Sequence, residues 1–178
     1  MRRLRILVAV LAIMALALPV SAGGREKASV NEFGTTTPTG GTASIVRTPA
    51  GVAVNVKLKD LTPGNALTVW FVHWDDLTQC AESGCTGSDL GDPGNGAIWS
   101  QIGGVVGRNG QFNQGSFVKV GEDTGGPFPL PLADPLAAEI HLVVQDHGPA
   151  TGDPAQTSEF MGACNEVCDD PQAAVFKP

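Results

Sequence analysis

The chain has no tyrosine, and of its 178 residues only 6% are aromatic and 16% charged. No stretch combines apolar and charged residues at the spacing of an amphipathic helix. Glycine and proline are abundant by contrast, with 23 and 13 copies, and the apolar residues fall in many short runs. This composition disfavours a helical protein and favours an all-β domain.

Long hydrophobic runs are absent except at the N-terminus. There, Arg2, Arg3 and Arg5 precede an apolar run over residues 6–18, followed by Pro19 and the small residues 20–22. The run is shorter than the ~20 residues that a membrane span needs. The pattern predicts that residues 1–22 are a signal peptide cleaved after position 22. We therefore expect a secreted or periplasmic protein with no membrane span after signal removal.

Positive charge is scarce in the remainder of the chain. Beyond residue 22 it has eight Lys and Arg against eighteen Asp and Glu, a net charge of −10. Such a surface disfavours nucleic acid as a partner and is compatible with cations. The length of this part predicts one domain with a real core.

Familiar catalytic motifs are also missing. The chain contains neither a Gly-x-Ser-x-Gly elbow nor a His-Glu-x-x-His zinc motif. Asp75, Asp76, Glu139 and Asp146 would suit a paired-carboxylate hydrolase only if the fold brought them together. The sequence therefore gives no positive indication of an enzyme.

What is present is a series of strand patterns. Residues 23–41 are rich in Gly, Thr and Pro and predict a flexible lead-in. Residues 52–58 alternate between apolar and polar, as in a strand with one buried face. Residues 67–74 are apolar at nearly every position, which is typical of a central strand covered on both faces. Asn109-Gly110 predicts a hairpin turn between two further strands.

Residues 139–144 alternate again, with Ile140, Leu142 and Val144 on one face. The proline-rich stretch 121–137 predicts a connection between sheets. Together these patterns predict that residues 42–178 form a single β-sandwich domain. Its architecture is a two-sheet, Greek-key-like sandwich of about seven to eight strands with two long disulfide-pinned loops.

Four cysteines lie in pairs within the two long loops. The pairs are Cys80 with Cys85 and Cys164 with Cys168. In an exported domain they predict two disulfides, and we favour local pairing because both loops contain residues that turn tightly. Crossed pairing and a four-thiolate zinc site are the alternatives.

The three histidines are His73, His141 and His147. One interpretation is that each ring packs in the fold and hydrogen-bonds a carbonyl or carboxylate. The other is a copper or zinc site formed by the three histidines and Asp75, which requires their two strands to be neighbours.

The second long loop is acidic. Oxygen ligands of this kind suit calcium, although the spacing matches no EF-hand. The candidate ligands are Asp153, Glu166, Asp169 and Asp170.

Several stretches resemble a group of uncharacterised secreted bacterial β-sandwich proteins. They are LTVWFVHW, GGVVGRNGQF, AEIHLVV-x-x-HGP and a Cys pair before DPQAAVF. A more distant similarity is to chordin-type repeat domains and copper-zinc superoxide dismutases. The dismutases carry a His-x-His pair, whereas this chain has His141-Leu142-Val143 at the matching place. The resemblance implies export and a β-sandwich, and it supplies no activity.

The sequence therefore predicts an exported β-sandwich with a binding or structural role at the cell envelope or outside the cell. The expected partner is a protein or glycan at the cell surface. The alternative function is a metal-binding protein, redox-active or not, that holds copper, zinc or calcium.

Overall fold

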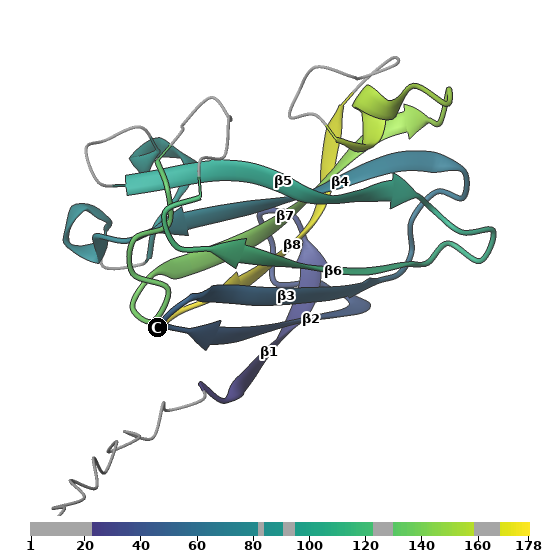
Figure 1. Ribbon diagram of the computed structural model, residues 1–178. Coiled ribbons are helices and arrows are strands. Elements are labelled where there is room, and N and C mark those ends of the chain that lie inside the picture. Colours follow the sequence, from purple (N-terminus) through teal and green to yellow (C-terminus); the bar gives the residue numbers. More distant parts are fainter. Residues whose placement is uncertain (1–22, 82–83, 91–94, 123–129, 159–167) are drawn as a thin grey trace, which may run out of the picture.

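The computed structural model describes residues 23–81, 84–90, 95–122, 130–158 and 168–178, with only the backbone for residues 95 and 97–101. The described part contains eight strands and no α-helix, so the all-β prediction is confirmed (Figure 1). The strands are β1 Arg25–Glu32, β2 Pro38–Thr48, β3 Gly51–Leu58, β4 Asn65–Trp74, β5 Asn95–Val105, β6 Phe112–Lys119, β7 Glu139–Pro149 and β8 Asp169–Phe176. Three short 3-10 helices accompany them, namely η1 Leu77–Gln79, η2 Gly87–Asp89 and η3 Pro154–Thr157.

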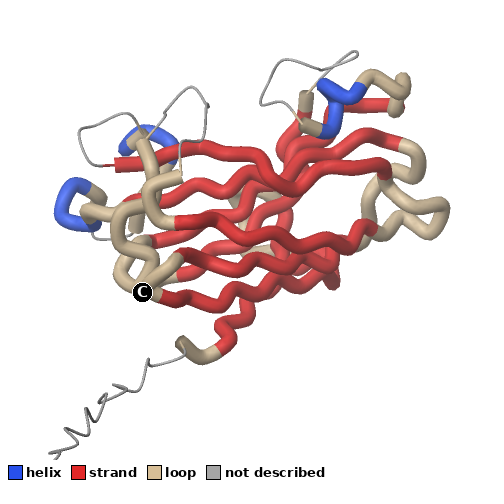
Figure 2. Tube along the Cα trace, in the orientation of Figure 1, coloured by secondary structure: helices blue, strands red, loops and turns tan. Residues whose placement is uncertain are grey.

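All eight strands belong to one antiparallel sheet, which curls into a nearly closed barrel (Figure 2). The strand order is β5-β4-β7-β8-β1-β2-β3-β6. The predicted division into two sheets is thus not confirmed. A sandwich and a curled single sheet both bury one face of each strand, so they produce the same alternation in sequence.

The first strand lies inside the segment predicted to be a flexible lead-in. Residues 25–32 form β1, and β2 begins at residue 38. The prediction for residues 23–41 is therefore wrong. The local signal is weak because Val30 is the only fully buried residue of β1. Hydrogen bonds to β2 along most of its length hold β1 in place despite its composition.

The interior of the curled sheet is one apolar core to which every strand contributes. Val52, Val54, Val56 and Leu58 of β3 face this core, as the alternation predicts. Ile140, Leu142 and Val144 of β7 do the same. Local alternation therefore assigns the inner face of both strands correctly.

A second, smaller apolar cluster covers the outer face of β4 and β7. Trp70, Val72 and Trp74 of β4 pack there with Val143 and with Cys85 from the loop after β4. Inner and outer clusters together bury β4 from residue 66 to residue 74. The prediction of a strand covered on both faces is confirmed.

Asn109-Gly110 lies in a tight turn between β5 and β6. The amide of Gly107 donates to the carbonyl of Gln111 at 3.0 Å, and Gly110 has a φ of 69°. However, β5 and β6 do not form a ladder, because they are the two ends of the sheet. The turn is instead tied to the loop before β4, where the amide of Leu61 donates to the carbonyl of Gly110 at 3.2 Å.

Residues 130–138 cross one end of the barrel, and Leu132 enters the core. The buried side chain of Arg47 holds this segment. Its Nη1 donates to the carbonyls of Pro135 and Ala138 at 3.0 and 2.6 Å, and its Nε lies 2.7 Å from a carboxylate oxygen of Glu26.

Among the described residues, no helix is long and apolar enough to cross a membrane.

Candidate functional site

A groove of about 490 Å³ lies on the outer surface of the barrel, where β1 and β8 diverge. Its walls come from β1 and the turn after it, from β7 and β8, and from the loop closed by the Cys80–Cys85 disulfide. The lining residues are Ala28, Ser29, Asn31, Glu32, Phe33, Gly34, Thr35, Cys85, Thr86, Gly87, His141, Val143, Ala173 and Val175.

The groove exists because two neighbouring strands separate. β1 and β8 pair through Asn31 opposite Ala173 and Glu32 opposite Gln172. The same register would next place Val30 opposite Ala174, but no pairing is present there in the described strands. The register of β1 against β2 shifts between Val30 and Asn31. A bulge bends its strand, so this irregularity accounts for the divergence of β1 from β8.

Apolar side chains are unusually exposed along the groove. Phe33 is 50% exposed and Val175 is 44% exposed. Ala28, Val143 and Ala173 continue the apolar surface between them. Such a surface costs free energy in water, and large exposed apolar patches commonly mark interaction sites.

A disulfide and two capped 3-10 helices hold the described part of the loop after β4. Cys80 and Cys85 form a disulfide with a Cα–Cα distance of 4.8 Å, which confirms the predicted local pair. Asp76 caps η1 by accepting the amide of Thr78 at 3.0 Å. Thr86 and Asp89 form a capping box around η2. Cys168 is also disulfide-bonded, and its predicted partner Cys164 lies outside the described residues.

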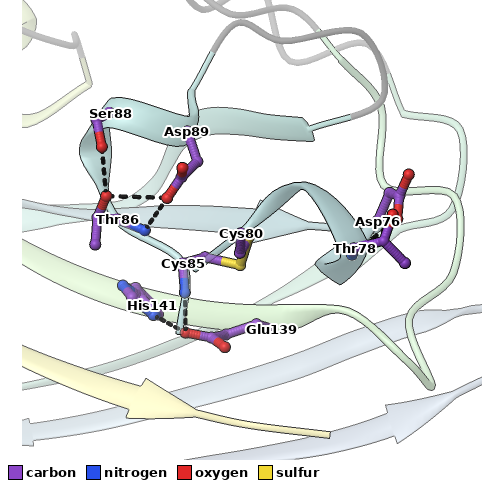
Figure 3. Close-up of a disulfide and its surroundings, with 9 residues drawn as sticks. All are labelled: Asp76, Thr78, Cys80, Cys85, Thr86, Ser88, Asp89, Glu139 and His141. Atoms are coloured by element: carbon purple, nitrogen blue, oxygen red, sulfur yellow. Dashed lines mark hydrogen bonds and ion pairs between the residues drawn. A yellow bond between two sulfur atoms is a disulfide. The ribbon is translucent and has the colours of Figure 1, made fainter. Parts of the chain in front are cut away.

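His141 contributes a polar side chain to the groove lining, and Figure 3 shows it beside Glu139 of the same strand. Nε2 of His141 lies 2.7 Å from Oε1 of Glu139, and the same oxygen accepts the amide of Cys85 at 3.3 Å. The two side chains share the outer face of β7 because they are two residues apart on a strand. The ring of His141 also packs on Trp74, with 4.5 Å between ring centroids.

Burial lowers the pKa of His141, and the opposing effect of Glu139 does not cancel it. The ring is therefore neutral at pH 7. Because the Glu139 carboxylate accepts, Nε2 carries the ring proton and Nδ1 is a hydrogen-bond acceptor. His141, which lines the groove, thus has one ring nitrogen that can accept a hydrogen bond.

His73 belongs to a different environment, inside the barrel. Nδ1 lies 3.0 Å from Oδ2 of Asp75, and Nε2 lies 3.2 Å from the carbonyl of Leu130. Asp75 in turn accepts the amides of Ala133 and Asp134. Burial alone would raise the pKa of Asp75, but His73 and these amides outweigh it, so the pKa is lowered. His73 and Asp75 hold the segment that covers the end of the barrel.

His147 lies at the other end of β7. Its Nε2 is 2.8 Å from the hydroxyl of Thr68, which also accepts the indole N–H of Trp70 at 3.1 Å. Its Nδ1 is 3.7 Å from the sulfur of Cys168. Burial lowers the pKa of His147.

The structure does not bring the predicted copper or zinc ligands together. The strands of His73 and His141 are neighbours, as that site required, but the two rings lie on opposite faces of the sheet. His147 is six residues beyond His141 on β7. Over the described ranges, no group of three or more His, Cys, Asp or Glu side chains is arranged to hold a metal ion.

Among the described residues, the predicted calcium ligands form no group of three that could hold a metal ion. Asp153 caps η3 by accepting the amide of Ala155 at 2.9 Å. Asp169 and Asp170 are the first two residues of β8, and Glu166 lies outside the described residues. Burial and the neighbouring charge of Asp169 raise the pKa of Asp170.

Sequence reasoning missed the main elements of the groove. The sequence analysis treats Glu139 as one of several strand-end carboxylates and His141 as a candidate metal ligand, and Phe33 lies in the segment predicted to be a lead-in. The spacing Glu139-x-His141 on a predicted strand was the available signal, since it places both side chains on one face. No sequence signal could have shown the separation of β1 from β8.

No protein-family model matches this chain, and no curated protein or solved structure matches it either.

Proposed function

We propose that this protein is an exported module that binds an extended peptide segment in the groove between β1 and β8. Export is inferred from the signal-peptide pattern of residues 1–22 and agrees with the Cys80–Cys85 disulfide, since disulfides persist in oxidising compartments. The single observation that carries the binding proposal is the separation of the two strands.

Separated strands leave backbone groups for a third strand to use. A strand directs alternate N–H and C=O groups to either side, and residues 25–30 of β1 pair with β2 on one side. Residues 174–176 of β8 likewise pair with β7 on one side. The opposite edges border the groove. An extended peptide that adds to such an edge gains main-chain hydrogen bonds, and pockets for its alternate side chains give specificity.

The side chains along the groove fit this type of ligand. Alternate residues of a bound strand would face the apolar surface of Phe33, Val143 and Val175. His141 and Asn31 would supply polar contacts beside them. We therefore expect a peptide with apolar residues at alternating positions.

The experiment begins with a random peptide library displayed on phage and selected against the full exported protein. Selected peptides are synthesised and titrated into the ¹⁵N-labelled protein. Within residues 25–30 or 174–176, binding should slow hydrogen exchange at the amides that point away from β2 or β7, because these amides gain a partner.

Two variants make the test specific. V175E places a charge within the groove and should weaken binding at least tenfold. V105E changes a valine that is 52% exposed on β5, outside the groove, and should leave binding unchanged. Equal effects of V175E and V105E, or protection at other amides, would overturn the proposal. So would pairing of two copies of the chain through β1 in place of a peptide, detected as concentration-dependent dimerisation.

A further inference from the structure

The outer face of β1, β2, β3 and β6 carries four of the eight Lys and Arg residues that follow residue 22, namely Arg25, Lys27, Lys57 and Lys119. These four strands are neighbours in the sheet, and β2, β3 and β6 lie side by side in Figure 1. Buried residues alternate with more exposed ones along β1, β2 and β3, and the register of β6 against β3 assigns the outward positions of β6. The outward-facing residues of this surface are Arg25, Lys27, Ser29, Asn31, Thr42, Ser44, Val46, Thr48, Ala53, Asn55, Lys57, Asn113, Gly115, Phe117 and Lys119.

No acidic residue occurs among these outward-facing positions. Glu26 lies between Arg25 and Lys27 in sequence, but its carboxylate is bound to the buried Arg47, 2.7 Å from Nε. Neighbouring carboxylates normally compensate lysines on a protein surface. Their absence here, in a chain with a net charge of −7, leaves a local region of positive potential.

The strand register gathers three of these charges around one hollow. Lys27 is opposite Ser44, which is opposite Asn55. In the adjacent row, Thr42 is opposite Lys57. Arg25, Lys27, Thr42, Ala43, Ser44, Asn55 and Lys57 line a hollow of about 180 Å³.

The chemistry of the lining selects one class of ligand. Each polar side chain there can donate a hydrogen bond, through a guanidinium, ammonium, hydroxyl or amide group. None is an anionic acceptor that would compete for these donors. Hydrogen bonds from ionised donors to an anionic oxygen are about twice as strong as neutral ones.

We propose that this hollow is an oxyanion-binding site, which holds a sulfate, phosphate or carboxylate group between Arg25, Lys27 and Lys57. The site is separate from the peptide groove and does not depend on it. β1 carries both, with Arg25 and Lys27 at the anion site and Ala28, Ser29, Asn31 and Glu32 at the groove.

The test is an NMR titration of the ¹⁵N-labelled full protein with sodium sulfate, phosphate or acetate, with sodium chloride added to hold ionic strength constant. We expect at least one of the three oxyanions to give saturable shifts of the amides of residues 25–27, 42–44 and 55–57. The oxyanion that saturates at the lowest concentration identifies the preferred group.

The variants K27Q and K57Q should each weaken this binding at least threefold. K119Q removes a charge from an exposed lysine on the same face of β6, away from the hollow, and should have no effect. All three side chains are exposed, so the variants should fold. Shifts that do not saturate with any oxyanion, or that K119Q weakens as much as K27Q and K57Q, would overturn the proposal. V175E, which tests the groove, should leave anion binding unchanged.

Discussion

His73 and His141 occupy neighbouring strands but face opposite sides of the sheet. His73 is paired with Ile140 and lies inside the barrel, whereas His141 is paired with Val72 and lines the outer groove. Each ring contacts its own carboxylate, Asp75 in one case and Glu139 in the other. The two histidines therefore form two separate polar contacts.

The first prediction concerns the energetic coupling of these contacts. We expect H73Q and D75N each to lower the free energy of unfolding by about 1–3 kcal/mol, because each leaves buried polar groups without partners. In a double-mutant cycle, His73 and Asp75 should show a coupling energy of about 0.5 kcal/mol or more. Urea denaturation measures these values.

The matched control is the cycle between His73 and His141. Because they share no partner, their coupling should be smaller than that between His73 and Asp75. A larger coupling between the two histidines would contradict their separation.

The second prediction concerns pH. Burial lowers the pKa of His141 and of His147 below the usual 6.5. The unfolded chain therefore binds more protons than the folded chain in the window between the lowered values and 6.5. It follows that the free energy of unfolding decreases as the pH falls through this window. Urea denaturation at pH 7.5 and pH 5 should show this loss.

Neighbouring charges also shift these pKa values. Glu139 raises and Lys177 lowers the pKa of His141, and Asp146 raises the pKa of His147. Asp170 opposes the trend, since its raised pKa favours the protonated folded state as the pH falls. The double variant H141Q/H147Q isolates the histidines, because Asp170 is unchanged in it. The decrease in stability between pH 7.5 and pH 5 should be smaller in the double variant than in the wild type. An equal decrease would show that other groups control it.

The third prediction concerns the Cys80–Cys85 disulfide. Replacing both cysteines with serine should lower the free energy of unfolding by about 2 kcal/mol, the chain-entropy value for so short a loop. The loop also forms a wall of the groove, so peptide binding should weaken as well. Denaturation and peptide titration of the same variant measure the two effects.

The single variant C80S is the control for side-chain packing. It breaks the Cys80–Cys85 disulfide but leaves the buried Cys85 side chain in place. If the single and double variants bind peptide as tightly as the wild type, the disulfide has no part in shaping the groove.

The fourth prediction concerns Gly103 on β5. A Cβ atom at this position would collide with the backbone carbonyl of Thr157 at the end of η3. G103A should therefore lower the free energy of unfolding by about 1–3 kcal/mol, the usual cost of overpacking. Thermal or urea denaturation is the measurement.

G87A is the matched control. A Cβ on Gly87 would meet nothing within 4 Å, so this variant should change stability by less than about 0.5 kcal/mol. Similar losses in G103A and G87A would mean that η3 does not pack against β5 as described.

Residues 67–74 and 140–144 show what the sequence by itself determined. Their apolar patterns predict a doubly buried strand and a strand with one inner face, and both predictions are confirmed. The Cys80–Cys85 pair is likewise predictable from its short spacing. Each of these features depends on the period of two in a strand or on a short loop, which are local properties of the chain.

The tertiary structure alone decided that the strands form one curled sheet, that residues 25–32 belong to it, and that β1 leaves β8 after two residue pairs. Pairing joins residues far apart in the chain, as with Asn31 and Ala173. Alternation states which face of a strand is buried but not which strand lies beside it. The groove and the basic hollow both arise from that choice of neighbours, so neither was visible in the order of the residues.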